Sequence, residues 1–365
     1  MVKLDRAPEK IDKLRKQLLK WYAHNRRDLP WRRSQDSYAI WVSEIMLQQT
    51  RVAVVVERYQ AFMGRFPTLV ALALAPEQEV LALWSGLGYY RRARMLHKAA
   101  QFVADHHQGN LPASAAELRL LPGIGAYTAA AIASIAHGEP VAVVDGNVER
   151  VLCRMAGWEA DGRTGSAALR RKVEELAGQL VDPRHPGDFN QALMELGATV
   201  CLPRNPECLV CPWAAECKTR GEHKTQPRAR MLSREVGHAL SIRIGQQPGE
   251  ANREVLLEQR PASLTVMPGL WELPVLREAE FPAEELRMTV RHAIMQVNYY
   301  VRIRTVFEDD VEALAVDGGE RRWVALRQAA GMALTGLTRK VLSRAHLFPS
   351  VSLDEIAPQA EADVL

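Results

Sequence analysis

The sequence predicts a chain of two parts, a wholly helical part followed by an α+β part. Apolar residues recur at helical spacing through the first two hundred residues, where strand-like alternation is scarce. A polar, basic stretch at 218–231 interrupts this pattern. Beyond it, β-branched segments alternate apolar with polar residues, as strands do. We therefore expect a helical domain over 1–217, a linker over 218–231, an α+β domain over 232–350 and a loose acidic tail over 351–365.

Short loops that carry Gly or Pro separate the expected helices. The first helix runs from Leu14 to Tyr22 with apolar residues four apart, and a second begins at Asp36 or Ser37 and runs to about Gly64. Further helices are expected at 77–83, 91–105, 113–120, 126–136, 148–156, 167–180 and 188–200. In the second part we expect strands at 236–244, 254–259, 290–306 and 322–326, and helices at 327–332 and 337–345.

The composition excludes several classes of protein. Hydrophobic residues make up 47% of the 365 residues and charged residues 25%, which excludes wholesale disorder, collagen and a disulfide-dense scaffold. No apolar run approaches the roughly 18 residues that a membrane span needs. The first ten residues are charged and lack a secretory apolar region. We therefore expect a cytoplasmic protein with no membrane partner.

Charge is distributed unevenly along the chain. Residues 1–230 carry 32 Lys and Arg against 24 Asp and Glu, a net charge of +8. Residues 231–365 carry 15 against 19, a net charge of −4, so the formal charge of the whole chain is +4. A basic first part favours a polyanionic partner. A solvated surface without a partner explains the same charges about as well.

Four of the five cysteines fall within 17 residues, as Cys201-x6-Cys208-x2-Cys211-x5-Cys217. In a reducing compartment, crowded thiols hold a metal more often than they form disulfides. Four thiolates can bind zinc or an iron–sulfur cluster, although structural zinc sites more often use two close Cys-x-x-Cys pairs. The fifth, Cys153, occupies an apolar helix position and is expected to be a buried hydrophobic residue.

The segment Leu121–Gly125, with the sequence LPGIG, lies between two expected helices. Gly123 and Gly125 allow a tight turn and a close approach to a ligand, and the following helix N-terminus presents free backbone N–H groups. Such a helix, hairpin and helix can hold a nucleic-acid phosphate without reading bases. A packing corner between two helices is the alternative.

Two carboxylates are candidates for acid and base chemistry. Glu44 lies among apolar residues of its expected helix, where lost hydration raises a carboxyl pKa and suits a general acid at neutral pH. Asp145 ends an apolar run just before another helix. A pair of carboxylates with separated pKa values is what cleavage of a glycosidic bond needs. The alternatives are a Glu44 tip that reaches solvent or a buried partner, and an Asp145 that only caps its helix.

The segment Ser85–Arg94 combines two glycines, two tyrosines and three arginines. Arginines hold phosphates, and an aromatic ring can enter a base stack. A glycine turn with tyrosines packed in the core is an equally good interpretation.

Together and in this order, these residues resemble the adenine DNA glycosylases of the MutY type, within the helix-hairpin-helix glycosylase superfamily. The resemblance is strong over residues 10–220 and weaker beyond, where the family has a Nudix-like domain. It rests on the segments 29–32, 43–52, 86–90, 121–125, 144–148 and 190–197 and on the four cysteines. It implies an all-α helix-hairpin-helix glycosylase domain with an iron–sulfur loop at 201–217, followed by an α+β Nudix-like domain.

The resemblance implies a role for each matching residue. Glu44 matches the acid that protonates the adenine, Asp145 matches the carboxylate that stabilises the developing sugar cation, and Tyr127 and Asn147 match residues that assist there. Matches to the adenine pocket are Arg32, Leu47 and Gln191. Matches to DNA-binding positions are Gln48, Gln49, Tyr89, Gly123 and Gly125. Cys201, Cys208, Cys211 and Cys217 match the ligands of a [4Fe–4S] cluster.

The resemblance also implies the reaction and the partner. We expect excision of adenine mispaired with 8-oxoguanine or guanine in double-stranded DNA, by a monomer that associates with the nucleoid. The related endonuclease III type carries a lysine two residues after the second hairpin glycine, where it forms a Schiff base. This chain has Tyr127 there. We therefore expect a monofunctional glycosylase.

The second part departs from the family's pattern at one segment. Where the family has a Phe-Ser-His-like segment that contacts 8-oxoguanine, this chain has Ile294-Met-Gln296. A methionine cannot donate a hydrogen bond as a serine can. We expect either relaxed discrimination or replacement of this contact by Gln296 or Asn298. The Nudix-like stretch 277–285 contains Pro282 and lacks the spacing of a Nudix hydrolase, so we expect a loop there.

Overall fold

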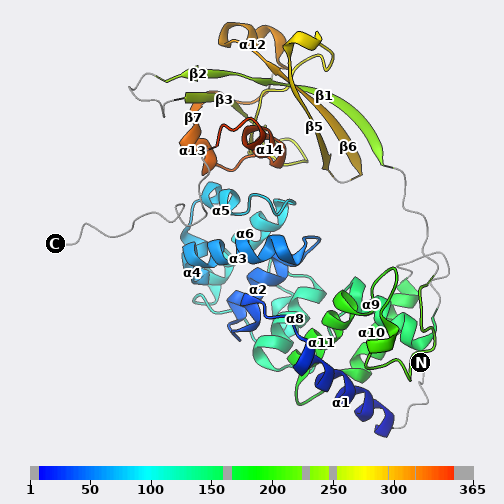
Figure 1. The fold of residues 1–365 in the computed structure, drawn as a ribbon. Coiled ribbons are helices and arrows are strands. Elements are labelled where there is room, and N and C mark those ends of the chain that lie inside the picture. Colours follow the sequence, from blue (N-terminus) through cyan, green and yellow to red (C-terminus); the bar gives the residue numbers. More distant parts are fainter. Residues whose placement is uncertain are drawn as a thin grey trace. The chain divides into compact units, whose positions relative to one another are not determined.

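The computed structural model describes residues 8–158, 167–223, 231–245, 253–294, 296–316 and 318–348 (Figure 1). Most of the predicted linker, 224–230, and the predicted tail, 351–365, lie outside the described residues. The predicted order of a helical part followed by an α+β part is confirmed.

The first part contains helices and no strand within its described residues. Their bounds are α1 (Pro8–Asn25), η1 (Pro30–Arg32), α2 (Ser37–Leu47), α3 (Val52–Arg65), α4 (Leu69–Leu74), α5 (Glu77–Leu83), α6 (Arg91–His106), α7 (Ala115–Leu118), α8 (Ala126–His137), α9 (Gly146–Ala156), α10 (Ala167–Leu180), α11 (Pro186–Thr199) and η2 (Cys208–Val210). The sequence did not predict α4, which is only six residues long.

The long helix predicted from Asp36 or Ser37 to Gly64 is wrong, because the chain leaves the helix after Leu47 and resumes it at Val52. Asp36 caps α2 as expected, accepting a hydrogen bond from the Tyr38 backbone N–H at 2.9 Å. The break contains Gln49, whose φ of 55° is left-handed. No Gly or Pro marks this position, so helical periodicity alone does not detect it.

One hydrophobic core joins α1, α9, α10 and α11, with Leu14 and Leu18 of α1 completely buried. Each such leucine stabilises the fold by about 1.5–3 kcal/mol relative to an exposed position. The cysteine-rich loop joins the same core through Trp213, whose indole Nε1 donates to the Leu14 carbonyl at 3.0 Å. This core therefore holds both the start of α9 and the cysteine loop in place.

The second part contains β1 (Leu232–Leu240), β2 (Ile242–Ile244), β3 (Arg253–Gln259), β4 (Trp271–Glu272), η3 (Ala283–Glu285), β5 (Leu286–Ile294), β6 (Val297–Thr305), α12 (Glu308–Leu314), β7 (Arg321–Ala325), α13 (Leu326–Ala330) and α14 (Gly336–Arg344). One sheet has the order β1-β6-β5, with β1 parallel to β6 and β5 antiparallel to it. In the other, β3 pairs with β2, β4 and β7, all antiparallel.

Two strand predictions need correction. The strand predicted at 236–244 is divided between β1 and β2, which belong to different sheets. The strand predicted at 290–306 is the hairpin of β5 and β6. Both hydrophobic segments continue the alternation across the break, so periodicity does not locate it. The stretch 277–285 forms a loop that ends in η3, as expected.

The strands lie between two sets of helices, with α12 on one side and α13 and α14 on the other (Figure 1). The larger core combines β-strand residues such as Val290 and Val301 with Val341 and Leu342 of α14. A smaller core packs Val311 of α12 against Ala239 and Leu256. Both faces of the strands are thus covered over part of their length.

Contacts divide the chain into two compact units that do not follow the order of the sequence. The first comprises residues 1–52, 68–73 and 98–227, and the second comprises 53–67, 74–97 and 228–365. Helix α3, helix α5 and the start of α6 therefore belong with the α+β part. The boundary predicted at 217–232 stays a prediction about the sequence domains.

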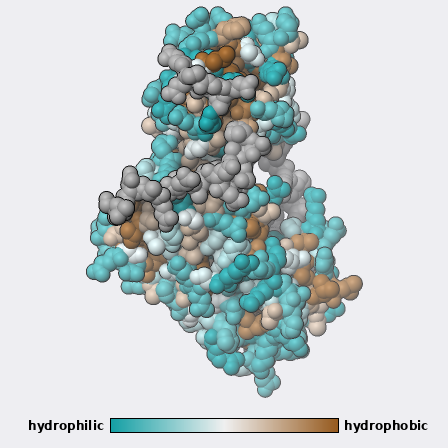
Figure 2. Space-filling model, turned by 60° about the vertical axis from the view of Figure 1, so that its left-hand side comes forward, coloured by the Kyte–Doolittle hydropathy of each residue, from teal (hydrophilic) through white to brown (hydrophobic). Residues whose placement is uncertain are grey.

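No described helix is both long and apolar enough to span a membrane. On the face shown in Figure 2, hydrophilic residues predominate and hydrophobic residues form small patches.

Candidate active site

A cavity of about 640 Å³ lies in the first unit and is lined by residues from η1, α2, α8, α9 and α11. It brings together residues that are far apart in the sequence, since α2 and α11 are separated by about 140 residues along the chain. The predicted site residues that line it are Arg32, Glu44, Leu47, Gln48, Gln49, Tyr127, Asp145, Asn147 and Gln191.

Glu44 is a buried carboxyl group, only 6% exposed, in the last turns of α2. The pKa of Glu44 is raised to about 7, mainly by burial and in smaller part by the nearby charge of Asp145. The Tyr127 hydroxyl donates to its Oε2 at 2.7 Å and works in the opposite direction, as does the charge of Arg32. Burial prevails, so Glu44 can hold and donate a proton near neutral pH.

Asp145 caps α9, as its position before the helix predicts. Its Oδ1 accepts from the Val148 backbone N–H at 2.7 Å, and its Oδ2 accepts from the Asn147 side-chain amide at 2.8 Å. Both carboxyl oxygens of Asp145 are therefore held by donors at the N-terminus of α9. Capping and lining the cavity are therefore compatible functions of one side chain.

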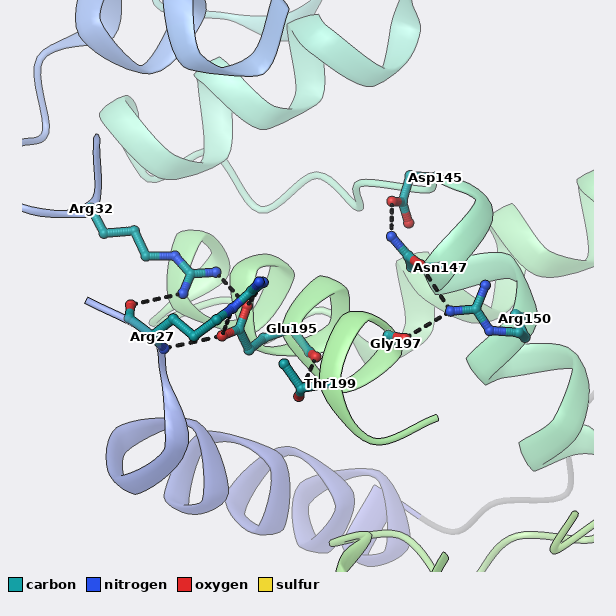
Figure 3. Close-up of polar contacts among 8 residues, drawn as sticks. All are labelled: Arg27, Arg32, Asp145, Asn147, Arg150, Glu195, Gly197 and Thr199. Carbon is teal, nitrogen blue, oxygen red and sulfur yellow. Dashed lines mark hydrogen bonds and ion pairs between the residues drawn. The ribbon is translucent and has the colours of Figure 1, made fainter. Parts of the chain in front are cut away.

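A chain of hydrogen bonds continues from Asp145 through Asn147 to Arg150 (Figure 3). The Arg150 guanidinium donates to Asn147 Oδ1 at 2.8 Å and to the Gly197 carbonyl at 2.7 Å. Its Nε donates to the Cys201 carbonyl at 2.8 Å. Arg150 thus fixes the amide of Asn147 with its N–H groups toward Asp145.

Position 197 requires glycine, because α11 approaches the start of α9 there. A Cβ atom at Gly197 would lie 2.7 Å from the Cβ of Asn147, closer than real carbon contacts. The glycine therefore permits the packing that holds Asn147 beside Asp145.

Sequence reasoning missed Glu195, a second buried carboxylate of the cavity, 1% exposed. Its oxygens accept from the Arg27 backbone N–H, from the Arg27 guanidinium at 2.8 and 2.7 Å, and from Arg32 Nη2 at 2.8 Å (Figure 3). Burial pushes the pKa of Glu195 up, but these hydrogen bonds outweigh it and bring the pKa to about 2.

Glu195 stays ionised and positions Arg32. Four donors occupy about all the lone-pair sites of a carboxylate, so its own oxygens have little capacity left for a ligand. Arg32 Nη1 also donates to the Arg27 carbonyl at 3.1 Å. The arginine at the cavity wall is therefore held from two directions. Glu195 lies in the matching segment 190–197, but its sequence neighbours do not show that it pairs with arginines from the start of the chain.

The break after α2 places two glutamines differently. Gln48 is half-buried and its amide donates to the Thr128 hydroxyl at 3.4 Å, while Gln49 is exposed with the left-handed φ of 55°. A non-glycine residue in this conformation costs about 1–2 kcal/mol. The strain presents the Gln49 side chain at the cavity.

The hairpin between α7 and α8 lies in the first unit, outside the residues that line this cavity. Gly123 has a φ of 74° and needs glycine for its conformation, whereas Gly125 has an ordinary φ of −86°. Both are exposed, and a Cβ atom at Gly125 would meet nothing within 4 Å. The N-terminus of the twelve-residue helix α8 is therefore exposed, and its binding of an anion stays a prediction.

Tyr89 lies in the second unit on the turn between α5 and α6, with half of its surface exposed. Its φ is 48°, and its neighbours Gly86 and Gly88 are also left-handed. Tyr90, in contrast, is buried, with 4% of its surface exposed. Tyr90 is therefore packed in the core as the second interpretation expects, while a DNA contact of the exposed Tyr89 stays a prediction.

The four clustered cysteines line a separate cavity, and all are free thiols. The buried Arg154, 3% exposed, donates to Cys201 Sγ at 3.4 Å, and the Arg220 backbone N–H donates to Cys217 Sγ at 3.4 Å. Cys153 is buried in the core, as expected. Among the residues that the structure describes, no group of three or more His, Cys, Asp or Glu is placed to hold a metal ion.

The segment that departs from the family pattern lies at the tip of the β5–β6 hairpin, since Ile294 ends β5 and Val297 begins β6. Met295 lies outside the described residues. The Gln296 carbonyl accepts from the Leu232 N–H at 2.9 Å, and Asn298 Oδ1 accepts from Arg291 at 3.3 Å. The exposed side chain of Gln296 is available at this tip.

Residues 42–179 match the family model described as HhH-GPD superfamily base excision DNA repair protein. The chain is 40% identical over 345 residues to the adenine DNA glycosylase of Homo sapiens, a match that covers 80% of this chain. The chain spans 62% of the length of that human relative. It is 45% identical over 205 residues to the adenine DNA glycosylase of Mycolicibacterium smegmatis, covering 56% of this chain and 68% of that protein.

Among solved structures, the chain is similar to that of a thermostable thymine-DNA glycosylase. The TM-score is 0.53 at 30% identity, and the match covers 58% of this chain and 97% of that one. The helical part therefore has a fold found in DNA glycosylases.

Proposed function

We propose, from the premise that this chain belongs to the adenine DNA glycosylases, that it excises adenine from duplex DNA by hydrolysing the N-glycosidic bond. The observation that carries the proposal is the pair of carboxyl groups in one cavity. Glu44 has a pKa of about 7, and both oxygens of Asp145 accept hydrogen bonds at the start of α9. Cleavage of a glycosidic bond needs one proton donor and one anion.

In the proposed reaction Glu44 protonates the adenine, which makes the base a better leaving group. The bond between the sugar and the base then breaks and positive charge develops on the sugar. Asp145 stabilises this charge, and water adds to the sugar carbon. Tyr127 donates to Glu44 and orients it, while Asn147 donates to Asp145 and orients that carboxylate.

A stacked base cannot reach this cavity, so we propose that the adenine is extruded from the duplex. Arg32, Leu47 and Gln191 would line the adenine pocket. Gln48 and Gln49 beside the cavity, and Tyr89 on its exposed turn, would contact the opened duplex. The hairpin with Gly123 and Gly125 would bind a phosphate through the N-terminus of α8.

We propose that the cysteine loop holds a [4Fe–4S] cluster. Four free thiols line one cavity there, and a buried guanidinium that pairs with no carboxylate among the described residues donates to one of the sulfurs. This donor set fits a negatively charged iron–sulfur group. Cys201, Cys208, Cys211 and Cys217 would hold the cluster, which would fix the loop on the core of α1 and α9.

The experiment for the cluster is metal analysis of the purified protein. We expect a brown protein with broad visible absorbance and about four irons per chain. A colourless protein with one zinc per chain would show that the cysteine loop binds zinc and not a cluster.

The experiment for the reaction is an excision assay with duplexes that carry adenine opposite 8-oxoguanine, guanine or thymine, followed by alkali to reveal abasic sites. We expect cleavage opposite 8-oxoguanine and guanine. Asp145→Asn should abolish cleavage and keep DNA affinity, while Asp188→Asn, at an exposed position of α11, serves as the matched control. Binding without cleavage of any duplex would leave a DNA-lesion binder instead of an enzyme.

The comparison of 8-oxoguanine with guanine also tests the hairpin tip. Equal rates opposite the two bases would mean relaxed discrimination at Ile294–Gln296. A preference for 8-oxoguanine that Gln296→Ala removes would assign the contact to that side chain.

We also propose that the enzyme has no lyase step, because Tyr127 bonds to Glu44 where a Schiff-base lysine would lie in the endonuclease III type. Borohydride should not trap the protein on adenine-mispaired DNA in high yield. The predictions of a monomer and of a cytoplasmic, nucleoid-associated location stay predictions.

A further inference from the structure

The turn at Ser85–Tyr90 in the second unit is under backbone strain. Gly86, Gly88 and Tyr89 have φ angles of 95°, 70° and 48°. The left-handed Tyr89 alone costs about 1–2 kcal/mol. Such strain persists only where surrounding contacts over-determine the conformation, so something must hold this turn.

Part of the support comes from the turn's own flanks. The buried indole of Trp84 donates to the Gly88 carbonyl at 3.2 Å. Arg92 Nη2 donates to the carbonyls of Leu87 and Gly88 at 3.0 and 3.1 Å. Its guanidinium also lies 5.7 Å from the centre of the Tyr89 ring. These contacts brace the middle of the turn and one face of the exposed tyrosine.

The two ends of the turn are held by residues about 250 positions later in the chain, in the same compact unit. Arg339 of α14 donates from Nε to the Ser85 hydroxyl at 2.7 Å. The Tyr90 hydroxyl donates to the Leu334 carbonyl at 2.9 Å. Ser85, Tyr90 and Leu334 are between 0% and 4% exposed, so water cannot replace either bond.

Arg339 is itself fixed before it reaches the turn. Its other nitrogens donate to the carbonyls of Ala330 and Met332, each at 3.2 Å. The loop between α13 and α14 and the first turns of α14 thus form one bonded unit with the arginine. Movement of this loop would be transmitted to Ser85 and Tyr90 together.

We propose that Leu334 and Arg339 form a clamp on the two ends of the Ser85–Tyr90 turn and so position Tyr89 against the duplex. The proposal rests on the proposed function, in which Tyr89 contacts opened DNA. Arg339 and Tyr90 are positioning residues, because they act through Tyr89. The C-terminal part would then contribute to DNA recognition by this clamp as well as by its β5–β6 hairpin tip.

Hydrogen exchange of the free protein tests the clamp without DNA. Tyr90→Phe removes only the hydroxyl, and we expect amides of residues 84–92 to exchange about 3- to 10-fold faster, as expected for one lost buried hydrogen bond. Arg339→Gln should have the same effect on the same peptide. Arg344→Gln, on an exposed position of the same helix, is the matched control and should change nothing there.

Single-turnover excision tests the consequence with the full chain. Tyr90→Phe should slow excision opposite 8-oxoguanine by about 3- to 10-fold and lower the Tm by only about 2–4 °C, so that the protein stays folded in the assay. In a Tyr89→Ala background, which has no ring to position, Tyr90→Phe should have no further effect. Arg344→Gln should excise at the wild-type rate.

Two results overturn the clamp: unchanged exchange and excision in both Tyr90→Phe and Arg339→Gln, or a full additional loss of rate in the Tyr89→Ala background. Arg339→Gln also removes bonds to the α13–α14 loop and could destabilise the protein. In that case the result for Tyr90→Phe alone decides. If the wild type excises adenine from no duplex, the proposed function fails, whereas the exchange experiment still decides whether the clamp exists.

Discussion

Two buried carboxyl groups line the same cavity and behave oppositely. Glu44 in α2 is 6% exposed and has a pKa of about 7, whereas Glu195 in α11 is 1% exposed and has a pKa of about 2. Burial pushes both values up. Glu44 receives one neutral hydroxyl donor, but Glu195 receives four N–H donors, three of them from guanidinium groups.

Hydrogen-bond donors, rather than the depth of burial, therefore decide the protonation state of a carboxyl group in this cavity. A carboxyl group with a single neutral donor stays partly protonated near pH 7 and can donate its proton. A carboxylate surrounded by charged donors stays an anion and serves as an anchor for Arg32. The comparison therefore separates a group that can take part in chemistry from one that holds the wall of the site.

The largest expected effect is on the reaction itself. Glu44→Gln removes the proton donor, and we expect single-turnover excision to fall by about 10²- to 10⁴-fold at every pH, with DNA affinity retained. Glu175→Gln, on the exposed face of α10, is the matched control. A Glu44→Gln variant that excises within threefold of wild type would remove Glu44 from the mechanism.

The role of Glu195 as the anchor of Arg32 should be measurable in the free energy of unfolding. Glu195→Gln leaves the guanidinium groups of Arg27 and Arg32 without their anion, and a broken buried pair costs about 3–5 kcal/mol. We expect about 3 kcal/mol in the free energy of unfolding, because the Arg27 side chain is 38% exposed and regains some hydration. Urea unfolding at pH 8 measures it. A loss no larger than that of Glu44→Gln under the same conditions would contradict the comparison.

An effect on stability of at most the same size is the pH dependence that Glu44 contributes. Its pKa is raised from 4.5 to about 7 in the folded protein, so the folded state holds a proton that the unfolded state releases between these values. The stabilisation is complete below pH 4.5 and is lost as pH rises through about 7. Relative to Glu44→Gln, the free energy of unfolding of the wild type should fall by up to about 3 kcal/mol between pH 4.5 and 8. A difference between the two proteins that stays constant across this range would refute the raised pKa.

Several features of the site could be predicted because each depends on local sequence. Asp36 and Asp145 cap the helices that follow them, and Gly123 turns the hairpin with a left-handed φ. The apolar neighbours of Glu44 on its helix suggested burial but left a solvent-exposed tip or a buried partner as the alternative, and the structure shows a buried carboxyl group with Tyr127 as its partner. These predictions required only residues within one or two turns of each other.

Other features could not be predicted because they depend on distant partners. Glu195 lies in the segment 190–197 that carries part of the resemblance, but no role was assigned to it there, and only its pairing with Arg27 and Arg32 gives it a function. The break after Leu47 is not marked by Gly or Pro. The assignment of α3, α5 and the turn with Tyr89 to the same compact unit as the α+β part reverses the grouping that sequence order suggests.

Helical periodicity and turn chemistry are short-range properties of a sequence. They were therefore enough to predict the helical and α+β parts, the helix caps, the hairpin, the cysteine cluster and the candidate carboxyl groups. The tertiary structure decided which of the carboxyl groups keeps its proton, how Arg150 links Asn147 to the cysteine loop, and which late residues bond to the Tyr89 turn. The reason is that desolvation and hydrogen bonding depend on neighbours contributed by distant segments, which come together only when the chain packs.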